Sequence, residues 1–425
     1  MKTRRTRSKN GLIAALDIGT GKIACFIARI GDQGTIRVVG IGHHASDGVR
    51  SGVISDVEAA ETAILSTVHA AEQMAGETIE KVIVNLSGGA PRSDILHYDV
   101  SIAGHEVGET DMRRVLAQGH AACASDDREL IHCVPVGYSI DGAKGIRDPR
   151  GMYGDRLGVN MHVVTATTGA VRTLVSCLAR CRLEVTDIVI APYAAGLAGL
   201  VEDEIALGST LIDMGAGTTS VAVFYDGHLL HADSVPVGGA HVTADIARGL
   251  STPLAHAERM KTLYGNAVAS GVDEREIIDV PLMGEEDRNQ ANHVPRSMLV
   301  SIIRPRLEET FELLRGRLEA AGYDKIAGRR VVLTGGASQL QGVLELAADI
   351  LDKQVRRGRP LRIAGLADST GGPAFAACAG LLVFAARRPD EAPAAAIAAR
   401  SRALLETGEP NGLFGRFGLW LRENL

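Results

Sequence analysis

Two aspartates, each followed closely by glycines, are the residues of this chain best suited to chemistry. The first, Asp17, lies in the segment 16–22, between two apolar runs that predict strands. A carboxylate at a strand end can hold a hydrated Mg²⁺. Gly19 lets the backbone approach phosphate oxygens, and Thr20 and Lys22 can add donors. The segment predicts a phosphate-binding turn, although a glycine-rich β-turn without a ligand would look the same.

The second aspartate repeats this arrangement in the other half of the chain. Asp213 follows an apolar run, and residues 214–221 are again rich in glycine and threonine. Two acidic hairpin loops can hold one polyphosphate from both sides. We therefore expect Asp17 and Asp213 to share one site.

A third segment, residues 331–338, has apolar residues leading into Gly335-Gly336, followed by Ala337 and an expected helix. A turn without Cβ atoms allows a flat adenine ring to lie close to the backbone. An ordinary turn before a helix is the alternative interpretation. The order and spacing of the three segments favour contact with adenosine.

These three segments, in this order, resemble the two phosphate loops and the adenosine loop of the actin, sugar kinase and heat-shock chaperone superfamily. Residues 189–196 and 371–374 are similar to the starts of its two connecting helices. The resemblance covers about residues 10–388. It implies an α/β, actin-like fold with two lobes, built from duplicated RNase H-like domains, that close on ATP and Mg²⁺.

Three strings narrow the resemblance to the bacterial cell-division FtsA family: residues 145–157, 238–250 and 257–265. A small α+β domain inserted in the first lobe is a further similarity. The resemblance implies phosphate contacts from both loops, Mg²⁺ held through water by the two aspartates, and ribose and adenine contacts from Glu258 and Lys261. For that last pair a solvated ion pair is the alternative. The implied nucleotide residues are Asp17, Gly19, Thr20, Lys22, Asp213, Gly215, Gly217, Thr218, Thr219, Glu258, Lys261, Gly335, Gly336 and Ala337.

One position departs from the superfamily pattern. Related chaperone ATPases have a glutamate before the proline of the first connecting helix, where it helps to position the attacking water. Here that residue is Ala191, before Pro192. We therefore expect ATP binding with at most slow hydrolysis, so that the nucleotide acts as a polymerisation switch.

The resemblance, together with changes in composition and secondary-structure pattern along the sequence, predicts a division of the chain into seven parts. The expected parts are a basic tail (1–10), a first actin-like domain (11–85, 163–206 and 370–388), an inserted domain (86–162), a second actin-like domain (207–244 and 331–369), a helical subdomain (245–330), a linker (389–411) and an amphipathic helix (412–425). Of these, the basic tail is either solvated or in contact with an anionic surface.

The last fourteen residues predict a membrane-surface helix. On a helical wheel Leu413, Phe414, Phe417, Trp420 and Leu421 gather on one side. Trp and Arg residues in such a helix suit the lipid interface. A helix that docks on the protein's own core is the alternative, which a linker containing proline disfavours. No run reaches the ~18 apolar residues that a membrane span needs.

The family resemblance also implies partners and a location. The C-terminal peptide of the tubulin-like protein FtsZ would dock on the helical subdomain, with Arg306 and Glu309 as candidate contacts. A solvated helix start is the alternative for that segment. Self-association into filaments, inner-membrane lipids and other division proteins, which would bind the inserted domain, complete the expected partners. The protein would then lie on the cytoplasmic face of the inner membrane, at the division site.

Composition bears on the class of protein and its compartment. The formal net charge of −6 argues against a dedicated nucleic-acid binder. Six scattered cysteines without a paired motif indicate reduced thiols in the cytoplasm. A sugar or acetate kinase of the same fold, which would need a catalytic base, and a pilus-assembly ATPase are the alternatives to a division protein.

Overall fold

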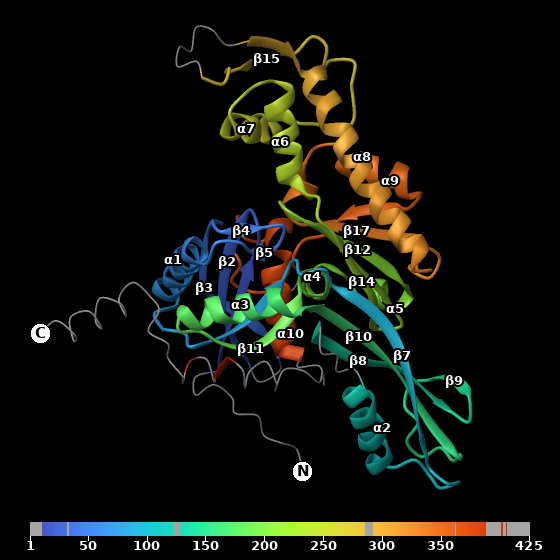
Figure 1. Cartoon of the computed structure of the whole chain (residues 1–425). Helices are drawn as coiled ribbons and strands as arrows, with labels where there is room; N and C mark the ends of the chain where they lie inside the picture. The colour runs from blue at the N-terminus through green and yellow to red at the C-terminus, as the bar shows by residue number, and fades with distance from the viewer. Residues whose placement is uncertain are drawn as a thin grey trace, which may run out of the picture.

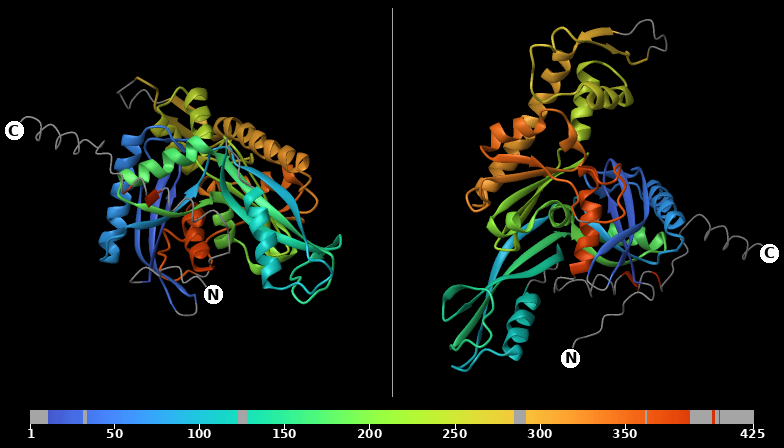
Figure 2. Two further views of the ribbon diagram at one scale, coloured as in Figure 1. Left: turned by 60° about the horizontal axis from the view of Figure 1, so that its bottom comes forward. Right: turned by 180° about the vertical axis from the view of Figure 1, so that it is seen from behind.

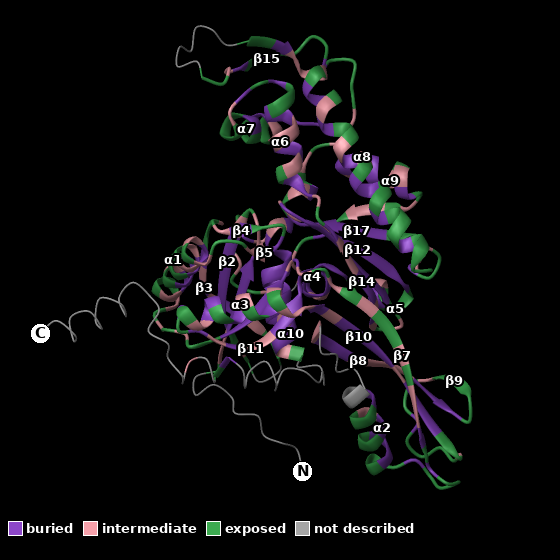
Figure 3. Ribbon diagram, viewed as in Figure 1, coloured by how far each residue is buried: buried purple, intermediate pink, exposed green. Residues whose placement is uncertain are grey.

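The computed structural model describes residues 11–31, 34–122, 128–284, 292–361, 363–387, 401–402 and 405 of the chain. Two five-stranded sheets lie at the centre (Figure 1). A mainly helical subdomain extends from one end of the molecule and a four-stranded inserted domain from the other, as the view from behind in Figure 2 also shows. Both central sheets are largely buried (Figure 3).

The first lobe is built on the sheet β11-β6-β1-β2-β3. Its strands are β1 Leu12–Ile18, β2 Lys22–Ile30, β3 Ile36–Ala45, β6 Lys81–Leu86 and β11 Glu184–Ile190, with a small hairpin of β4 Val49–Arg50 and β5 Val53–Ile54 beside them. Helix α1 (Val57–Ala75) packs on β2 and β3, whereas α10 (Ala376–Arg387) packs on β1 and β2. Asp56 caps the start of α1, and Gly76 ends it at a positive φ that favours glycine. Helix α3 (Thr168–Arg180) completes this lobe.

The second lobe repeats this plan with the sheet β14-β13-β12-β17-β18. Its strands are β12 Ser209–Met214, β13 Thr219–Tyr225, β14 His228–Val235, β17 Arg330–Thr334 and β18 Gln354–Arg357. Helices α5 (Glu202–Leu207) and α9 (Val343–Leu351) accompany it. In both lobes an antiparallel meander of three strands is followed by a parallel strand beside the first one. The duplication expected from the sequence is therefore present in the strand order.

One helix of the first lobe reaches the second sheet. Helix α4 (Ala191–Gly199) contacts α10 and also β12 and β13 of the second sheet. A Cβ at Gly380 would lie 1.7 Å from the Ala194 carbonyl oxygen, and one at Gly196 would lie 2.3 Å from the Phe224 ring. Glycine is required at Gly380 because two backbones approach closely there, and at Gly196 because a buried aromatic ring packs on its backbone.

The inserted domain is the sheet β7-β10-β8-β9 with one helix. Its elements are β7 Arg92–Ser101, α2 Glu109–Ala122, β8 Arg128–Ile140, β9 Ala143–Ile146 and β10 Arg156–Thr167. Because β10 is continuous through Thr167, the boundary expected after residue 162 falls inside a strand. Ser93 accepts from the Ala232 amide (3.1 Å) and His132 from the Ile190 amide (3.1 Å), so this domain is tied to both lobes.

The helical subdomain comprises α6 Gly239–Gly249, α7 Leu254–Tyr264, the hairpin β15 Ile277–Val280 with β16 Asn292–Pro295, and α8 Arg296–Ala320. Pro305 lies inside α8, not at its start. The alternative of a solvated helix start for this segment is wrong, since the helix begins nine residues earlier, at Arg296.

The described part of the linker contacts the first lobe. The buried Ser401 hydroxyl accepts from the Val185 amide (2.8 Å), and Arg402 pairs with Glu184 (2.9 Å) at the start of the edge strand β11. The basic tail and the amphipathic segment 412–425 lie outside the described residues. Among the helices that are described, none has the length and apolar character to cross a membrane.

Candidate functional site

The two glycine-rich loops meet across the gap between the lobes. Each closes an antiparallel hairpin in the same way, with Gly19 donating to the Lys22 carbonyl (3.0 Å) and Gly215 to the Thr218 carbonyl (2.9 Å). A Cβ at Gly217 would lie 2.5 Å from the Thr20 hydroxyl oxygen. A Cβ at Gly21 would similarly lie 2.9 Å from that of Ala216. The loops can touch only because these glycines carry no side chain.

Asp17 is buried at the end of β1, and a neighbouring strand holds its carboxylate. Asn85 Nδ2 donates to Asp17 Oδ1 (2.6 Å). Burial raises the pKa of Asp17, while the nearby Lys22 charge and the Asn85 hydrogen bond oppose that rise. The side chain is therefore oriented by the protein and partly compensated in charge.

Asp213 occupies the equivalent position at the end of β12. Burial raises its pKa to about 6, repulsion from Asp17 adds to this, and Lys22 counteracts it. The charge of Asp17 thus acts on the Asp213 carboxyl. That the two carboxylates share one nucleotide site stays a prediction.

The threonines and Lys22 make contacts within the protein. The Thr20 hydroxyl accepts from the Gly52 amide (3.0 Å), and that of Thr218 donates to the Ser87 carbonyl (3.3 Å). Lys22 donates to the Ala374 carbonyl and lies 4.9 Å from the centre of the Phe375 ring. Thr219 is fully buried and its hydroxyl donates to the Val237 carbonyl (2.8 Å), so its side chain supports a loop and does not face the gap.

The expected adenosine turn adjoins the second aspartate. Gly335 has a φ of 83°, and a Cβ there would lie 2.5 Å from Asp213 Oδ1. Gly336 and Ala337 begin the short 3₁₀ helix η2 (Gly336–Gln339). The Gly335 amide donates to the Pro373 carbonyl (3.1 Å) in a second 3₁₀ helix, η3 (Pro373–Phe375).

Glu258 and Lys261 lie together on α7 and contact the start of α6. Their ion pair measures 2.6 Å, and Lys261 also donates to the Gly239 carbonyl (3.0 Å) and the Thr243 hydroxyl (2.8 Å). The Lys261 side chain is 15% exposed and that of Glu258 54%, so the ion pair is present with its carboxylate half in solvent, and its contact with ribose and adenine stays a prediction. A Cβ at Gly239 would lie 3.1 Å from that of Ala337, which places this group beside the adenosine turn.

A cleft of about 730 Å³ opens beyond that turn. It is lined by Arg357, Arg359, Pro360, Leu361, Ile363, Leu366, Ala367, Asp368, Gly371, Gly372 and Pro373. Arg357 donates to the Ser338 carbonyl in η2 (3.1 Å). The cleft thus extends from the site defined by the three loops.

Two buried carboxylates, Asp17 and Asp213, are the groups of this site that suit a cation. Within the described ranges, no group of three or more His, Cys, Asp or Glu side chains is arranged to hold a metal ion. Asp17 and Asp213 are both buried beside these hairpins, and the charge of Asp17 acts on Asp213. Such a donor set suits Mg²⁺, which keeps most of its waters and shares oxygen ligands with phosphates.

Sequence reasoning missed Asn85, Ser87 and Thr243. Asn85 interrupts an otherwise apolar strand, and that buried amide was the available signal. Arg306 and Glu309 lie elsewhere, on α8, where Arg306 pairs with both Glu309 and Asp245 of α6. The five apolar residues of the expected membrane face, Leu413 to Leu421, are outside the described part of the chain.

Comparison with known proteins identifies the class. The solved PilM-PilN type IV pilus biogenesis complex matches with a TM-score of 0.62 at 19% identity, covering 90% of this chain and 99% of that one. MreB5 of Spiroplasma citri bound to ADP matches with a TM-score of 0.51 at 14% identity, covering 89% and 97%. The fold is therefore that of the actin-like ATPases, as expected, including the duplicated domains and the insertion.

Two family models match, "Cell division protein FtsA" over residues 210–380 and "SHS2 domain inserted in FTSA" over residues 88–165. The cell division protein FtsA of Rhizobium meliloti (strain 1021) is 46% identical over 98% of this chain and 95% of its own length. The chain belongs to the FtsA family of cell division proteins. Its role therefore lies in division, and the kinase and pilus-assembly alternatives have less support.

Proposed function

We propose that the gap between the two aspartate loops binds ATP together with Mg²⁺. The observation that supports this proposal is the direct approach of the loops, Gly21 to Ala216 and Gly217 to Thr20, together with the charge of Asp17 that acts on Asp213. An actin-like protein that was solved with ADP, MreB5 of Spiroplasma citri, supports it through the shared fold. When bound, Mg²⁺ would neutralise charge on the phosphate oxygens.

Different residues would contact the metal, the phosphates and the adenosine. Asp17 and Asp213 would orient the waters of the metal, and the backbone amides of both loops would donate to phosphates. Lys22 keeps ammonium protons beyond the one given to Ala374. Glu258 and Lys261 lie where a ribose and base would pass toward Gly335, Gly336 and Ala337.

Hydrolysis is expected to be slow. Ala191 is the first residue of α4 and its methyl group cannot accept a proton from water. The bound nucleotide would then favour one lobe arrangement for long periods, which suits control of self-association.

Titration with a fluorescent ATP analogue, in Mg²⁺ and in EDTA, tests the site. The natural protein should bind the analogue, and should bind it more tightly in Mg²⁺ than in EDTA. Asp213→Ala should reduce this gain in affinity from Mg²⁺. If the natural protein does not bind the ATP analogue, the proposal is wrong.

At the division site, we infer, the protein forms filaments on the cytoplasmic face of the inner membrane and links FtsZ to lipid. Family membership supports the division role. The apolar face from Leu413 to Leu421 supports lipid contact, and Ser401 and Arg402 attach the middle of the linker to the first lobe. The inserted domain would serve other division proteins.

Liposome sedimentation tests the membrane part. The full chain should sediment with anionic liposomes, more so with Mg-ATP, whereas a chain ending at Arg388 should stay in solution. Trp420→Glu should release the full chain without changing ATP affinity. Equal sedimentation of the full and shortened chains would show that the tail is not the anchor.

The FtsZ peptide would have to exchange partners with Arg306, because Arg306 already donates to Asp245 (2.6 Å). Exposed apolar side chains in the same subdomain, Leu254, Ile277 and Met298, would suit the apolar part of such a peptide. Arg306→Glu should weaken binding of the FtsZ C-terminal peptide. Arg304→Glu is the matched control, since among the described residues Arg304 pairs with Glu308 of its own helix (2.7 Å); equal losses would argue against a specific contact.

A further inference from the structure

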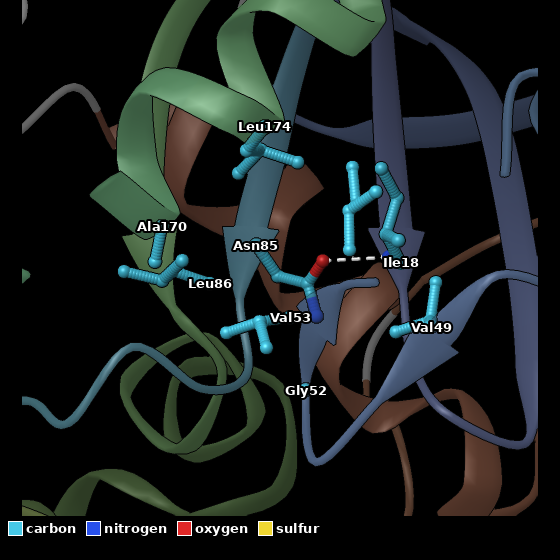
Figure 4. Close-up of a pocket in the computed structure, with 9 residues that line it drawn as sticks. Ile18, Val49, Gly52, Val53, Asn85, Leu86, Ala170 and Leu174 are labelled. Atoms are coloured by element: carbon cyan, nitrogen blue, oxygen red, sulfur yellow. Dashed lines mark hydrogen bonds between the residues drawn. The ribbon is translucent and has the colours of Figure 1, made fainter. Parts of the chain in front are cut away.

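Asn85, at the end of β6, is almost completely buried, and its amide has a determined orientation. Its Oδ1 accepts from the Ile18 amide (2.7 Å), as the dashed line in Figure 4 shows. A backbone N–H can only donate, so the atom facing Ile18 must be the oxygen. Nδ2 therefore points the other way, where it donates to Asp17 Oδ1 (2.6 Å) and Ser87 Oγ (2.8 Å).

The surroundings of Asn85 leave no room for a ligand of its own. The cavity drawn in Figure 4 has a volume of about 10 Å³, and its other lining side chains, such as Val49, Val53 and Leu174, are apolar. That volume holds at most one water molecule. The polar contacts of Asn85 are thus directed at the protein.

The second lobe lacks this contact. Pairing of β1 with β6 runs through Leu16 and Val84, which sets Asp17 beside Asn85, and pairing of β12 with β17 sets Asp213 beside Thr334. The Thr334 hydroxyl donates to the carbonyls of Pro373 (3.1 Å) and Gly358 (3.3 Å) instead. Among the described residues, only the aspartate of the first lobe receives a side-chain hydrogen bond from its parallel neighbour.

The same strand end also reaches both phosphate loops. The Ser87 carbonyl accepts from the Thr218 hydroxyl (3.3 Å) of the second loop. Gly52, whose amide donates to the Thr20 hydroxyl of the first loop, packs on the backbone of Ser87 and Gly88. A displacement of residues 85–88 would therefore disturb the contacts of both phosphate loops.

We propose that Asn85 is a positioning residue of the nucleotide site, which fixes the Asp17 carboxylate toward the interlobe gap and, through Ser87, links the ends of the two phosphate loops. The proposal rests on the proposed nucleotide function. A partner that orients a group next to a metal typically contributes tenfold to a hundredfold in affinity. The effect should appear only when the metal accompanies the nucleotide, because Asp17 would act through the metal's waters.

Two variants separate the contacts of Asn85. Asn85→Asp keeps an oxygen for the Ile18 amide but removes the donor to Asp17 and adds a repelling charge. Asn85→Ala removes all three hydrogen bonds, to Ile18, Asp17 and Ser87, without adding charge. Thr67→Val is the matched control, since Thr67 is also a buried hydrogen-bonding residue of the first lobe, donating to Ala63 (2.8 Å) within α1.

Titration of each purified full-length variant with a fluorescent ATP analogue, in Mg²⁺ and in EDTA, tests the proposal. Both Asn85 variants should bind about tenfold more weakly in Mg²⁺, and Asn85→Ala, which adds no charge, should stay within about twofold of the natural protein in EDTA. Thr67→Val should match the natural protein in both buffers. Circular dichroism melting establishes that each variant is folded, and Asn85→Ala alone decides the matter if Asn85→Asp does not fold.

The outcomes are distinguishable. If the natural protein binds no nucleotide, the proposed function itself fails. If it binds and folded Asn85→Ala binds equally well in Mg²⁺, or loses the same factor in EDTA, Asn85 does not position Asp17 and the present inference is overturned.

Discussion

The two halves of the molecule have the same backbone at their aspartate loops but different neighbours around the carboxylates. Gly19 and Gly215 close equivalent hairpins, yet the closing residue is Lys22 in one and Thr218 in the other. Asp17 has Asn85 beside it, whereas Asp213 has Thr334, which donates elsewhere. Duplication has supplied the geometry, and side chains outside the repeated motif set the charge and orientation of each carboxylate.

This difference predicts unequal losses when the aspartates are removed, and that is the largest effect we expect. Asp17→Ala should weaken Mg-ATP binding about a hundredfold at neutral pH, because an oriented carboxylate is lost. Asp213→Ala should cost about tenfold, since the neighbouring Thr334 donates elsewhere and does not orient the Asp213 carboxylate. The measurement is the same titration with a fluorescent ATP analogue, and equal losses would break the comparison.

The pH dependence of stability sharpens the comparison for the nucleotide-free protein. The pKa of Asp213 is raised to about 6 from an ordinary value of 3.8. An acid with a raised pKa in the folded state stabilises that state below its unfolded pKa, and this stability is lost as the pH rises through 6. The free energy of unfolding of Asp213→Asn, minus that of the natural protein, should therefore be larger at pH 7 than at pH 4 by on the order of 1–3 kcal/mol.

Denaturant unfolding at pH 4, 5, 6 and 7 measures this effect as the difference between variant and natural protein. Thr67→Val serves as a control that loses a buried hydrogen bond without losing a titrating group, so its difference should not change with pH. A flat difference for Asp213→Asn would show that Asp213 does not titrate near pH 6.

The loop contact offers a steric test of the same comparison. Gly217→Ala places a methyl group 2.5 Å from the Thr20 hydroxyl, and Gly21→Ala places one 2.9 Å from the Ala216 methyl. Overpacking of this kind costs about 1–3 kcal/mol, so nucleotide affinity should fall roughly fivefold or more, with Gly217→Ala the worse of the two. Gly169→Ala, with no atom within 4 Å of the added carbon, should bind normally in the same titration.

Much of this architecture could be predicted from the sequence, because the hairpins depend on local patterns. Asp17 and Asp213 each stand at the end of an apolar run before glycines, which is enough to place them at strand ends. The pairing of Glu258 with Lys261 also follows from helical spacing.

The neighbours of the aspartates could not be predicted in the same way. Asn85 reaches Asp17 across a parallel strand pairing between residues that lie far apart in the chain. Thr334 occupies the equivalent position beside Asp213, but its hydroxyl donates to the Pro373 carbonyl in η3. Local sequence carries no information on which of two such side chains faces the site. The same holds for Arg306, whose carboxylate partner Asp245 lies on another helix.

The smallest predicted effect is at Thr334, the counterpart of Asn85. Thr334→Val is nearly isosteric and removes the hydrogen bonds to Pro373 and Gly358, which should cost about 1 kcal/mol of folding stability. Because the hydroxyl does not contact Asp213, affinity for Mg-ATP should stay within about twofold, against the roughly tenfold loss for Asn85→Ala. Denaturant unfolding and nucleotide titration of the two variants, side by side, measure both quantities. A loss of Mg²⁺-dependent affinity as large for Thr334→Val as for Asn85→Ala would mean that the two halves support their aspartates alike, and that the asymmetry around Asp17 has no consequence for binding.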